Sequence, residues 1–219
     1  MTDLQNQKIN KRGRGRPPVR SEAETRRLLI EAAAQEFQSK GFASAAMGSI
    51  SQRAGVSTRT IYQLVSTKAE LFELVIVDRS GRFMPGIDEG ALDILEPVEA
   101  LRRILVSYGT LTLSAETIAM TRLVIAEGER FPEIAAVFHA QGVERVNRVI
   151  EGWLVRQSER GIIALRDTDP HAAAGMLRGM MIMEPQRAVF LGKAMAPSPA
   201  EIAERAKACA LMFLRGCQA

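Results

Sequence analysis

Apolar residues recur mostly three and four positions apart along the chain, the spacing of one helix face, and stretches alternating in period two are scarce. Three pairs fit the S/T-x-x-E pattern of a helix-capping box: Ser21–Glu24, Thr67–Glu70 and Ser198–Glu201. The pattern therefore predicts an all-α protein of about nine helices. We expect them near residues 21–39, 46–53, 57–63, 67–83, 97–113, 115–129, 132–160, 170–191 and 199–216. Because Gly81, Pro85, Gly86 and Gly90 interrupt the pattern, we expect a linker at 84–95.

Positive charge is concentrated at the start of the chain. Of the 219 residues, the first 20 hold six basic side chains and one acidic one, a net charge of +5. The other 199 carry 23 basic and 24 acidic groups, a net charge of −1. This basic end is therefore the candidate for contact with nucleic acid.

The remaining composition narrows the class of protein. Apolar residues make up 47% and charged residues 25%, as in ordinary globular proteins. We expect a cytoplasmic protein with no membrane partner, because there are two cysteines, no apolar run long enough to span a bilayer and no signal sequence. The sequence has no HExxH, GxSxG, GxGxxG or Walker motif, so we predict no enzyme activity, no catalytic residues, no cofactor and no metal.

Residues 44–63 have the layout of a helix-turn-helix: a short helix, a turn at Ala54-Gly55-Val56, and a second helix capped by Ser57. Val56 and Ile61 can pack inward while polar side chains of the second helix face out. Such a helix fits the major groove of double-stranded DNA, where Arg59 could bond a guanine with two hydrogen bonds. The alternative is that these polar groups only solvate a helical hairpin.

The residues of this region together resemble the TetR family of transcriptional regulators. The resemblance runs through Gly41-Phe42, Ile50, Ala54 to Ser57, Thr60 to Tyr62, and Lys68 with Glu70-Leu71. The later stretch 123–142, LVIAEGERFPEIAAVFHAQG, resembles the effector domain of the AcrR/AefR-like branch, which includes efflux-pump regulators. The sequence departs from the family pattern at Ala45-Ala46, Ser49 and Leu64-Val65, and the first change removes a hydroxyl that would contact a phosphate.

The charge pattern and helix signals predict a disordered basic arm at 1–20, and with the resemblance they imply a helix-turn-helix domain at 21–66 and a ligand-binding and dimerisation domain at 67–219. It places Thr58, Arg59, Thr60 and Tyr62 on a DNA-recognition helix begun by Ser57. Lys68 would bind a backbone phosphate, and Ser44 would cap the second helix in place of the missing threonines.

The arm contains Arg14-Gly15-Arg16-Pro17, which resembles the core of an AT-hook. In that motif two arginines lie along a narrow minor groove of A·T-rich DNA, where negative potential is concentrated. We therefore add Arg14 and Arg16 to the candidate DNA-binding residues. The alternative is a solvated basic tail.

The second half supplies apolar, methionine-rich helices in which TetR-like proteins hold an effector. The candidate ligand-binding residues are Tyr108, Met120, Arg122, Trp153, Met176, Met180 and Met183, with ordinary core packing as the alternative for each methionine and for Trp153. Small and apolar residues of the last two helices recur at helical spacing and predict a homodimer interface, with an internal core as the alternative. This interface set is Ala173, Leu177, Met181, Glu184, Ile202, Ala206, Ala210 and Phe213.

The sequence thus predicts a homodimeric regulator, most simply a repressor, that binds an inverted-repeat operator and is released by a small apolar effector. Two other classes stay open at this stage. One is an architectural protein that coats A·T-rich DNA through its arm. The other is a helical enzyme or carrier built around the apolar bundle.

Overall fold

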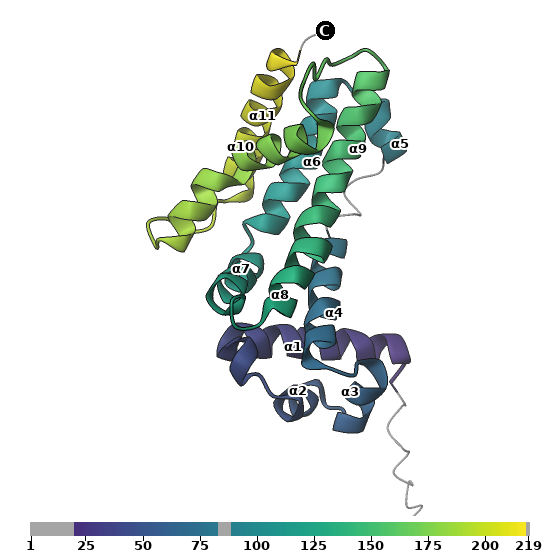
Figure 1. Ribbon diagram of the computed structural model, residues 1–219, viewed down its shortest axis with the longest axis vertical. Coiled ribbons are helices and arrows are strands. Elements are labelled where there is room, and N and C mark those ends of the chain that lie inside the picture. The colour runs from purple at the N-terminus through teal and green to yellow at the C-terminus, as the bar shows by residue number, and fades with distance from the viewer. Residues whose placement is uncertain (1–19, 83–88, 218–219) are drawn as a thin grey trace, which may run out of the picture.

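The computed structural model describes residues 20–82 and 89–217, and this part of the chain is helical, as the apolar spacing predicts. Figure 1 shows α1 to α3 gathered at one end and a taller bundle at the other, with α4 connecting the two. The helices are α1 (Glu22–Ser44), α2 (Met47–Ala54), α3 (Thr58–Leu64), α4 (Lys68–Gly81), α5 (Glu89–Asp93), α6 (Pro97–Thr112), α7 (Ala115–Glu127), α8 (Pro132–Val137), η2 (Phe138–Glu144), α9 (Arg145–Glu159), α10 (Pro170–Phe190) and α11 (Pro199–Gly216).

Local sequence chemistry sets most helix starts. Ser21, Ser57 and Thr67 each accept a hydrogen bond from the backbone N–H three residues on, as capping residues do. Ser198 and Glu201 form a complete capping box at the start of α11. Each cap satisfies amide groups that the first helical turn leaves without a partner, so these boundaries lie within two residues of the predicted ones.

The helix-turn-helix end has its own apolar core, which extends beyond residue 66. Leu29, Phe37, Ile50 and Ile61 pack there with residues from the first half of α4, including Phe72. The rings of Phe37, Phe42 and Phe72 contact one another at centroid distances of 5.5 to 5.8 Å. Residues of α7 and α8 close this core from the side of the bundle, so these two helices pack on the helix-turn-helix end.

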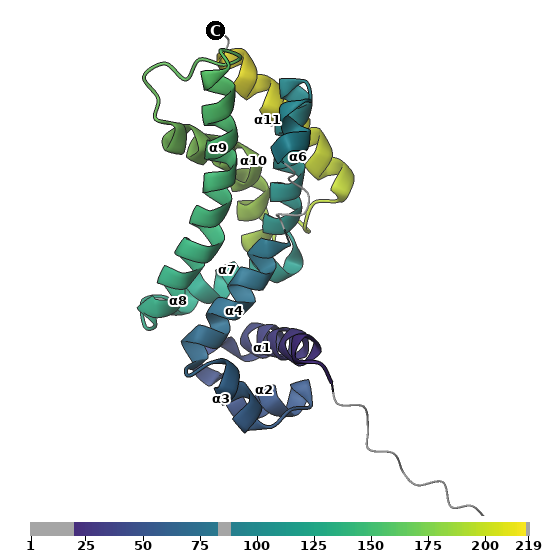
Figure 2. The ribbon, with the colours of Figure 1, turned by 90° about the vertical axis from the view of Figure 1, so that its right-hand side faces the viewer.

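The bundle packs around Trp153, which is 1% exposed. Its core is built from α6, α9, α10 and α11, with Leu101, Ile150, Leu177 and Ala210 among the buried residues. Figure 2, turned by a quarter, shows the same separation of the bundle from α1–α3 and the same connection through α4. No helix in 20–82 or 89–217 is long and apolar enough to cross a membrane.

Between residues 84 and 160, two regions differ from the predicted elements. The expected linker contains the short helix α5, because Leu92 is buried against the bundle core and fixes this segment. The single helix expected at 132–160 is instead α8, the π-helical segment η2 and α9. A π-helical segment is rare and short, and over the seven residues of η2 the apolar spacing does not distinguish it from an α-helix.

Candidate functional site

The turn between α2 and α3 has the geometry of a helix-turn-helix. Gly55 adopts φ +65°, a left-handed conformation that glycine favours, and its N–H donates to Gln52 O. Val56 N then donates to Ser51 O, and Ser57 begins α3 with its hydroxyl accepting from Thr60 N at 3.1 Å. Ile61 is fully buried and fixes α3 on the domain core.

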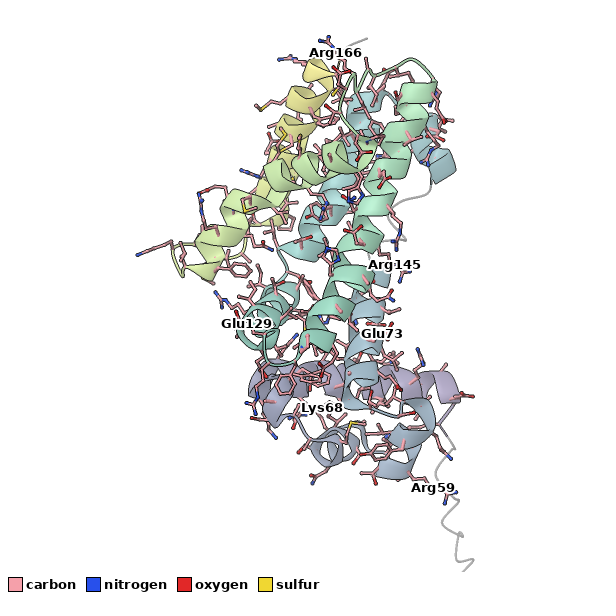
Figure 3. All side chains as sticks on the ribbon, in the orientation of Figure 1. Arg59, Lys68, Glu73, Glu129, Arg145 and Arg166 are labelled. Carbon is pink, nitrogen blue, oxygen red and sulfur yellow. The ribbon has the colours of Figure 1, made fainter. Side chains whose placement is uncertain are left out.

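The opposite side of α3 faces solvent. Thr58 and Arg59 are exposed, and Tyr62 is 57% exposed although it is aromatic. Figure 3 shows Arg59 at the end of the molecule farthest from the bundle, pointing away from the protein. Thr60 is half-buried, and its hydroxyl shares a hydrogen bond of 2.9 Å with Ser57 Oγ. The predicted recognition residues therefore lie together, with Thr58, Arg59 and Tyr62 the most accessible.

Lys68 does something that the sequence analysis did not predict. Its Nζ donates to the carbonyl oxygens of Phe42, Ala43 and Ala45 at 2.6, 3.1 and 3.1 Å, and it lies 4.7 Å from the Phe42 ring centroid. Three hydrogen bonds use all three ammonium protons. In this conformation Lys68 has none left for a DNA phosphate, and its visible role is to hold the end of α1.

Glu127, at the end of α7, holds the same segment from the other side. Its carboxylate accepts hydrogen bonds from Phe42 N at 3.0 Å and Ala43 N at 2.7 Å. These amides are available because Gly41, at φ +78° and ψ 170°, interrupts the α1 helix. Residues 41–45, which we call the hinge segment, are therefore fixed by Glu127 through amides and by Lys68 through carbonyls.

At the DNA-binding end, the predicted capping role of Ser44 is wrong, and the predicted role of the arm arginines is not tested. Ser44 does not cap α2: the cap position is Ala46, without a side-chain bond, because α1 runs on to Ser44. Arg14 and Arg16 lie outside the described residues, so their role in the minor groove stays a prediction. Arg20, the first described residue, donates to Ala54 O and Gly55 O at 3.2 and 3.3 Å, which places the end of the arm beside the helix-turn-helix turn.

A cavity of about 210 Å³, which we call the bundle cavity, lies between α4, α6, α7, η2, α9 and α10. This is smaller than the roughly 300–1,000 Å³ of most ligand pockets. Its apolar wall is made by Ile76, Leu111, Met120, Phe138, Val143, Val146 and Ile182. Its polar groups come from Arg79, Ser80, Tyr108, Thr112, Thr117, Thr121, Arg178 and Gln186.

Two of the seven predicted ligand-binding residues, Tyr108 and Met120, line this cavity. The other five do not, and that part of the prediction is corrected. Trp153 is buried in the bundle core, and Met180 packs partly buried against the same core. Met176 and Met183 are 63% and 60% exposed, whereas Arg122 donates to Val189 O and Phe190 O outside the cavity.

The cavity contains two arginines that the sequence analysis missed. The Nε atoms of Arg79 and Arg178 are both buried and have no hydrogen-bond partner. Burial raises the pKa of Tyr108, although Arg178 beside its hydroxyl acts in the opposite direction. No signal in the sequence distinguishes these arginines from surface ones, because only folding brings residues of α4 and α10 to the same cavity.

The predicted dimer interface is also corrected. Six of its eight residues are buried within the chain itself and unavailable to a partner: Ala173, Leu177, Met181, Ile202, Ala206 and Ala210. Met181 and Ile202 pack against α6 at Gly109, where an added Cβ would lie 2.6 Å and 2.9 Å from their terminal carbons. Glu184 is exposed and paired with Arg187, and Phe213 is half-buried.

Comparison with protein families assigns both parts of the chain. Residues 29–75 match the model of the bacterial regulatory proteins of the tetR family. Residues 99–218 match the model described as the AefR-like transcriptional repressor, C-terminal domain. The sequence has no significant match to a curated protein.

Solved structures share this architecture over nearly their whole length. A TetR-family transcriptional regulator from Mesorhizobium loti is 25% identical, with a TM-score of 0.77 over 91% of this chain and 100% of its own. The flavonoid-responsive regulator FrrA is 26% identical, with a TM-score of 0.71 over 90% and 98%. A TetR-family regulator from Pseudomonas syringae pv. tomato, 21% identical with a TM-score of 0.68 over 90% and 99%, shows the same fold.

Proposed function

The chain belongs to the TetR family of transcriptional regulators and has an AefR-like repressor C-terminal domain, and we propose that it is a homodimer that binds an inverted-repeat operator and leaves it when a small effector enters the bundle cavity. TetR regulators are DNA-binding proteins and not enzymes. As part of this proposal we divide the chain into an arm at 1–20, a DNA-binding domain at 21–66 and an effector and dimerisation domain at 67–219, with the first half of α4 packed on the core of the DNA-binding domain.

The observation that carries the DNA-binding half of the proposal is the exposed side of α3. Thr58, Arg59 and Tyr62 project from a helix that Ile61 anchors and Ser57 caps. An anchored helix with exposed polar residues near its N-terminus can enter the major groove without rearranging the domain. Arg59 is the residue of choice for a guanine, because a guanidinium can donate two parallel hydrogen bonds to O6 and N7.

A methionine stripe supports the dimer. Met176 and Met183, seven residues apart on α10, share one helix face and are mostly exposed, and Met212 on α11 is 68% exposed. We propose that these exposed side chains of α10 and α11 form one apolar patch, which is the mark of a protein interface. In a symmetric dimer each patch faces its copy, and the two recognition helices then reach half-sites about one DNA turn, or a multiple of it, apart.

The cavity supports effector control because its walls belong to helices that reach the DNA-binding end. Ile76 and Arg79 on α4 and Met120 on α7 line it. The same α4 begins with Lys68, and the same α7 ends with Glu127, both on the hinge segment. An effector that displaces α4 changes the separation of the recognition helices. The coupling free energy between effector binding and DNA binding is typically about 1–3 kcal/mol. FrrA is described as flavonoid-responsive, which supports small-molecule control in a structure of this shape.

Selection of genomic fragments by the full-length protein at near-physiological salt tests the proposal. We expect recovery of a discrete inverted repeat, and we expect the Arg59→Ala variant to fail to enrich it. Recovery of diffuse A·T-rich DNA, with the variant behaving as the parent does, would refute the operator proposal and favour the architectural alternative. Dependence on Arg59 separates the two because shape-based minor-groove binding does not use α3.

A further inference from the structure

The bundle cavity is electropositive as well as apolar. Its lining includes the guanidinium groups of Arg79 and Arg178, and none of the described residues that line it is aspartate or glutamate. A neutral apolar ligand would need neither cation. The two positive charges therefore need negatively charged partners.

Arg79 is balanced from outside the cavity. Its Nη1 lies 2.9 Å from a carboxylate oxygen of Glu116, in the first turn of α7. Arg178 differs, because within 20–82 and 89–217 no carboxylate lies within ion-pair distance of it. Its Nε is buried and has no hydrogen-bond partner, and the polar group beside it is the Tyr108 hydroxyl. Arg178 is therefore the uncompensated cation of this cavity.

An uncompensated, partly desolvated cation destabilises a fold unless something pairs with it. Guanidinium groups match carboxylates with two parallel hydrogen bonds, which makes them selective for planar anions. Given the proposed effector function, on which this inference rests, we propose that the effector is an amphipathic carboxylic acid whose carboxylate pairs with Arg178. Tyr108 supplies a further hydrogen bond to that carboxylate.

The rest of the cavity fits the apolar part of such a molecule. Leu111, Met120, Phe138 and Val146 line the cavity with aliphatic, thioether and aromatic groups. The volume of about 210 Å³ suits a compact ring system or a short alkyl chain, not a large conjugate. The class is therefore a small aromatic or medium-chain aliphatic acid.

Matched acid and amide pairs test the charge directly. Isothermal titration of the full-length protein would compare 2-naphthoate with 2-naphthamide, and decanoate with decanamide. We expect at least one acid to bind about tenfold or more tightly than its amide, because charge-assisted hydrogen bonds are stronger than neutral ones. Arg178→Met should abolish this preference and leave amide binding unchanged. Arg187→Met is the matched control: it removes an exposed arginine of the same helix and should keep the preference.

Equal binding of acid and amide, a preference that survives in Arg178→Met, or no acid binding at roughly 1 mM would overturn the inference. Operator binding measured on the same preparation separates this failure from failure of the proposed function, since only the latter abolishes it. Thermal unfolding of the empty variant supplies a second readout. Loss of an unpaired cation should leave the melting temperature of Arg178→Met equal or higher, whereas a lower value would show that Arg178 is structural.

Discussion

Replacing Gly41 with alanine should destabilise the DNA-binding end of the molecule far more than a surface substitution does. Gly41 has φ +78° and ψ 170°, a region that is essentially restricted to glycine. A Cβ added there would lie 2.3 Å from Glu127 Oε1, a distance at which the carboxylate has to move. The substitution therefore strains the backbone and displaces the group that holds the hinge segment.

The magnitude follows from these two effects. Forcing a non-glycine residue into this region costs about 1–3 kcal/mol. Displacing Glu127 removes hydrogen bonds to Phe42 N and Ala43 N, and a bond to a charged group contributes about 1.5–3 kcal/mol when partly buried, as the one to Phe42 is. We expect a loss of about 3–5 kcal/mol in the free energy of unfolding, a large part of the stability of an ordinary domain.

Urea denaturation at fixed protein concentration measures this loss, with Gly48→Ala as the control. Gly48 lies in α2 with nothing within 4 Å of an added Cβ, so alanine there should stabilise the protein by up to about 1 kcal/mol. In a Glu127→Ala background the clash is gone, and Gly41→Ala should cost only the backbone strain, about 1–3 kcal/mol. A loss below about 1 kcal/mol, or an equal loss in both backgrounds, would refute the reasoning.

Four further predictions concern DNA, charge and assembly. Arg59→Ala should weaken operator binding by about 1–3 kcal/mol in an electrophoretic mobility assay and leave non-specific binding largely intact. Replacing Arg14 and Arg16 together with alanine should reduce the salt dependence of DNA affinity by roughly two contacts, and an unchanged slope would exclude the arm from the complex. The hydrogen bond from Lys40 lowers the pKa of buried Glu36, so its stabilisation is present above the usual carboxyl pKa of 4.5 and is lost as pH falls through the lower folded value. Glu36→Gln should therefore cost stability at pH 7, and denaturation curves should show the difference narrowing below pH 4.5. Met183→Glu should convert the proposed dimer to monomer in sedimentation analysis, and a surviving dimer would place the interface elsewhere.

The sequence predicts best what is decided locally. Ser57 caps α3 because a hydroxyl at that position satisfies an amide three residues on, and Gly55 makes the turn because its backbone needs a positive φ. Both effects depend on a few adjacent residues, and so the helix-turn-helix follows from sequence alone. Glu127 could not be found in this way, because its partners Phe42 and Ala43 lie more than 80 residues earlier in the chain.

The sequence also does not predict which face of α10 packs inside the chain, for a different reason. Ala173, Leu177 and Met181 follow one helical row, and Met176 and Met183 follow another. Both rows are apolar, so periodicity shows two candidate faces and does not indicate which one packs inside the chain. In the folded chain the row with Met181 is the buried one, because Gly109 of α6 has no side chain and leaves room for Met181. Six of the eight predicted interface residues therefore belong to the internal core, and two of the four methionines assigned to the ligand, Met176 and Met183, face solvent.

The arrangement of α4 and α7 determines what an effector has to do. Each helix lines the cavity and also holds the hinge segment. Lys68 of α4 binds the carbonyl oxygens of that segment, and Glu127 of α7 binds its amides. Filling the cavity without moving one helix relative to the other would leave both attachments as they are, and a ligand that binds both states equally shifts nothing. A carboxylate held at Arg178 of α10 gives the ligand a fixed point outside both helices. In the proposed mechanism the apolar part of the ligand presses from that point on α4 and α7 unequally, and this is the differential interaction that release from DNA would require.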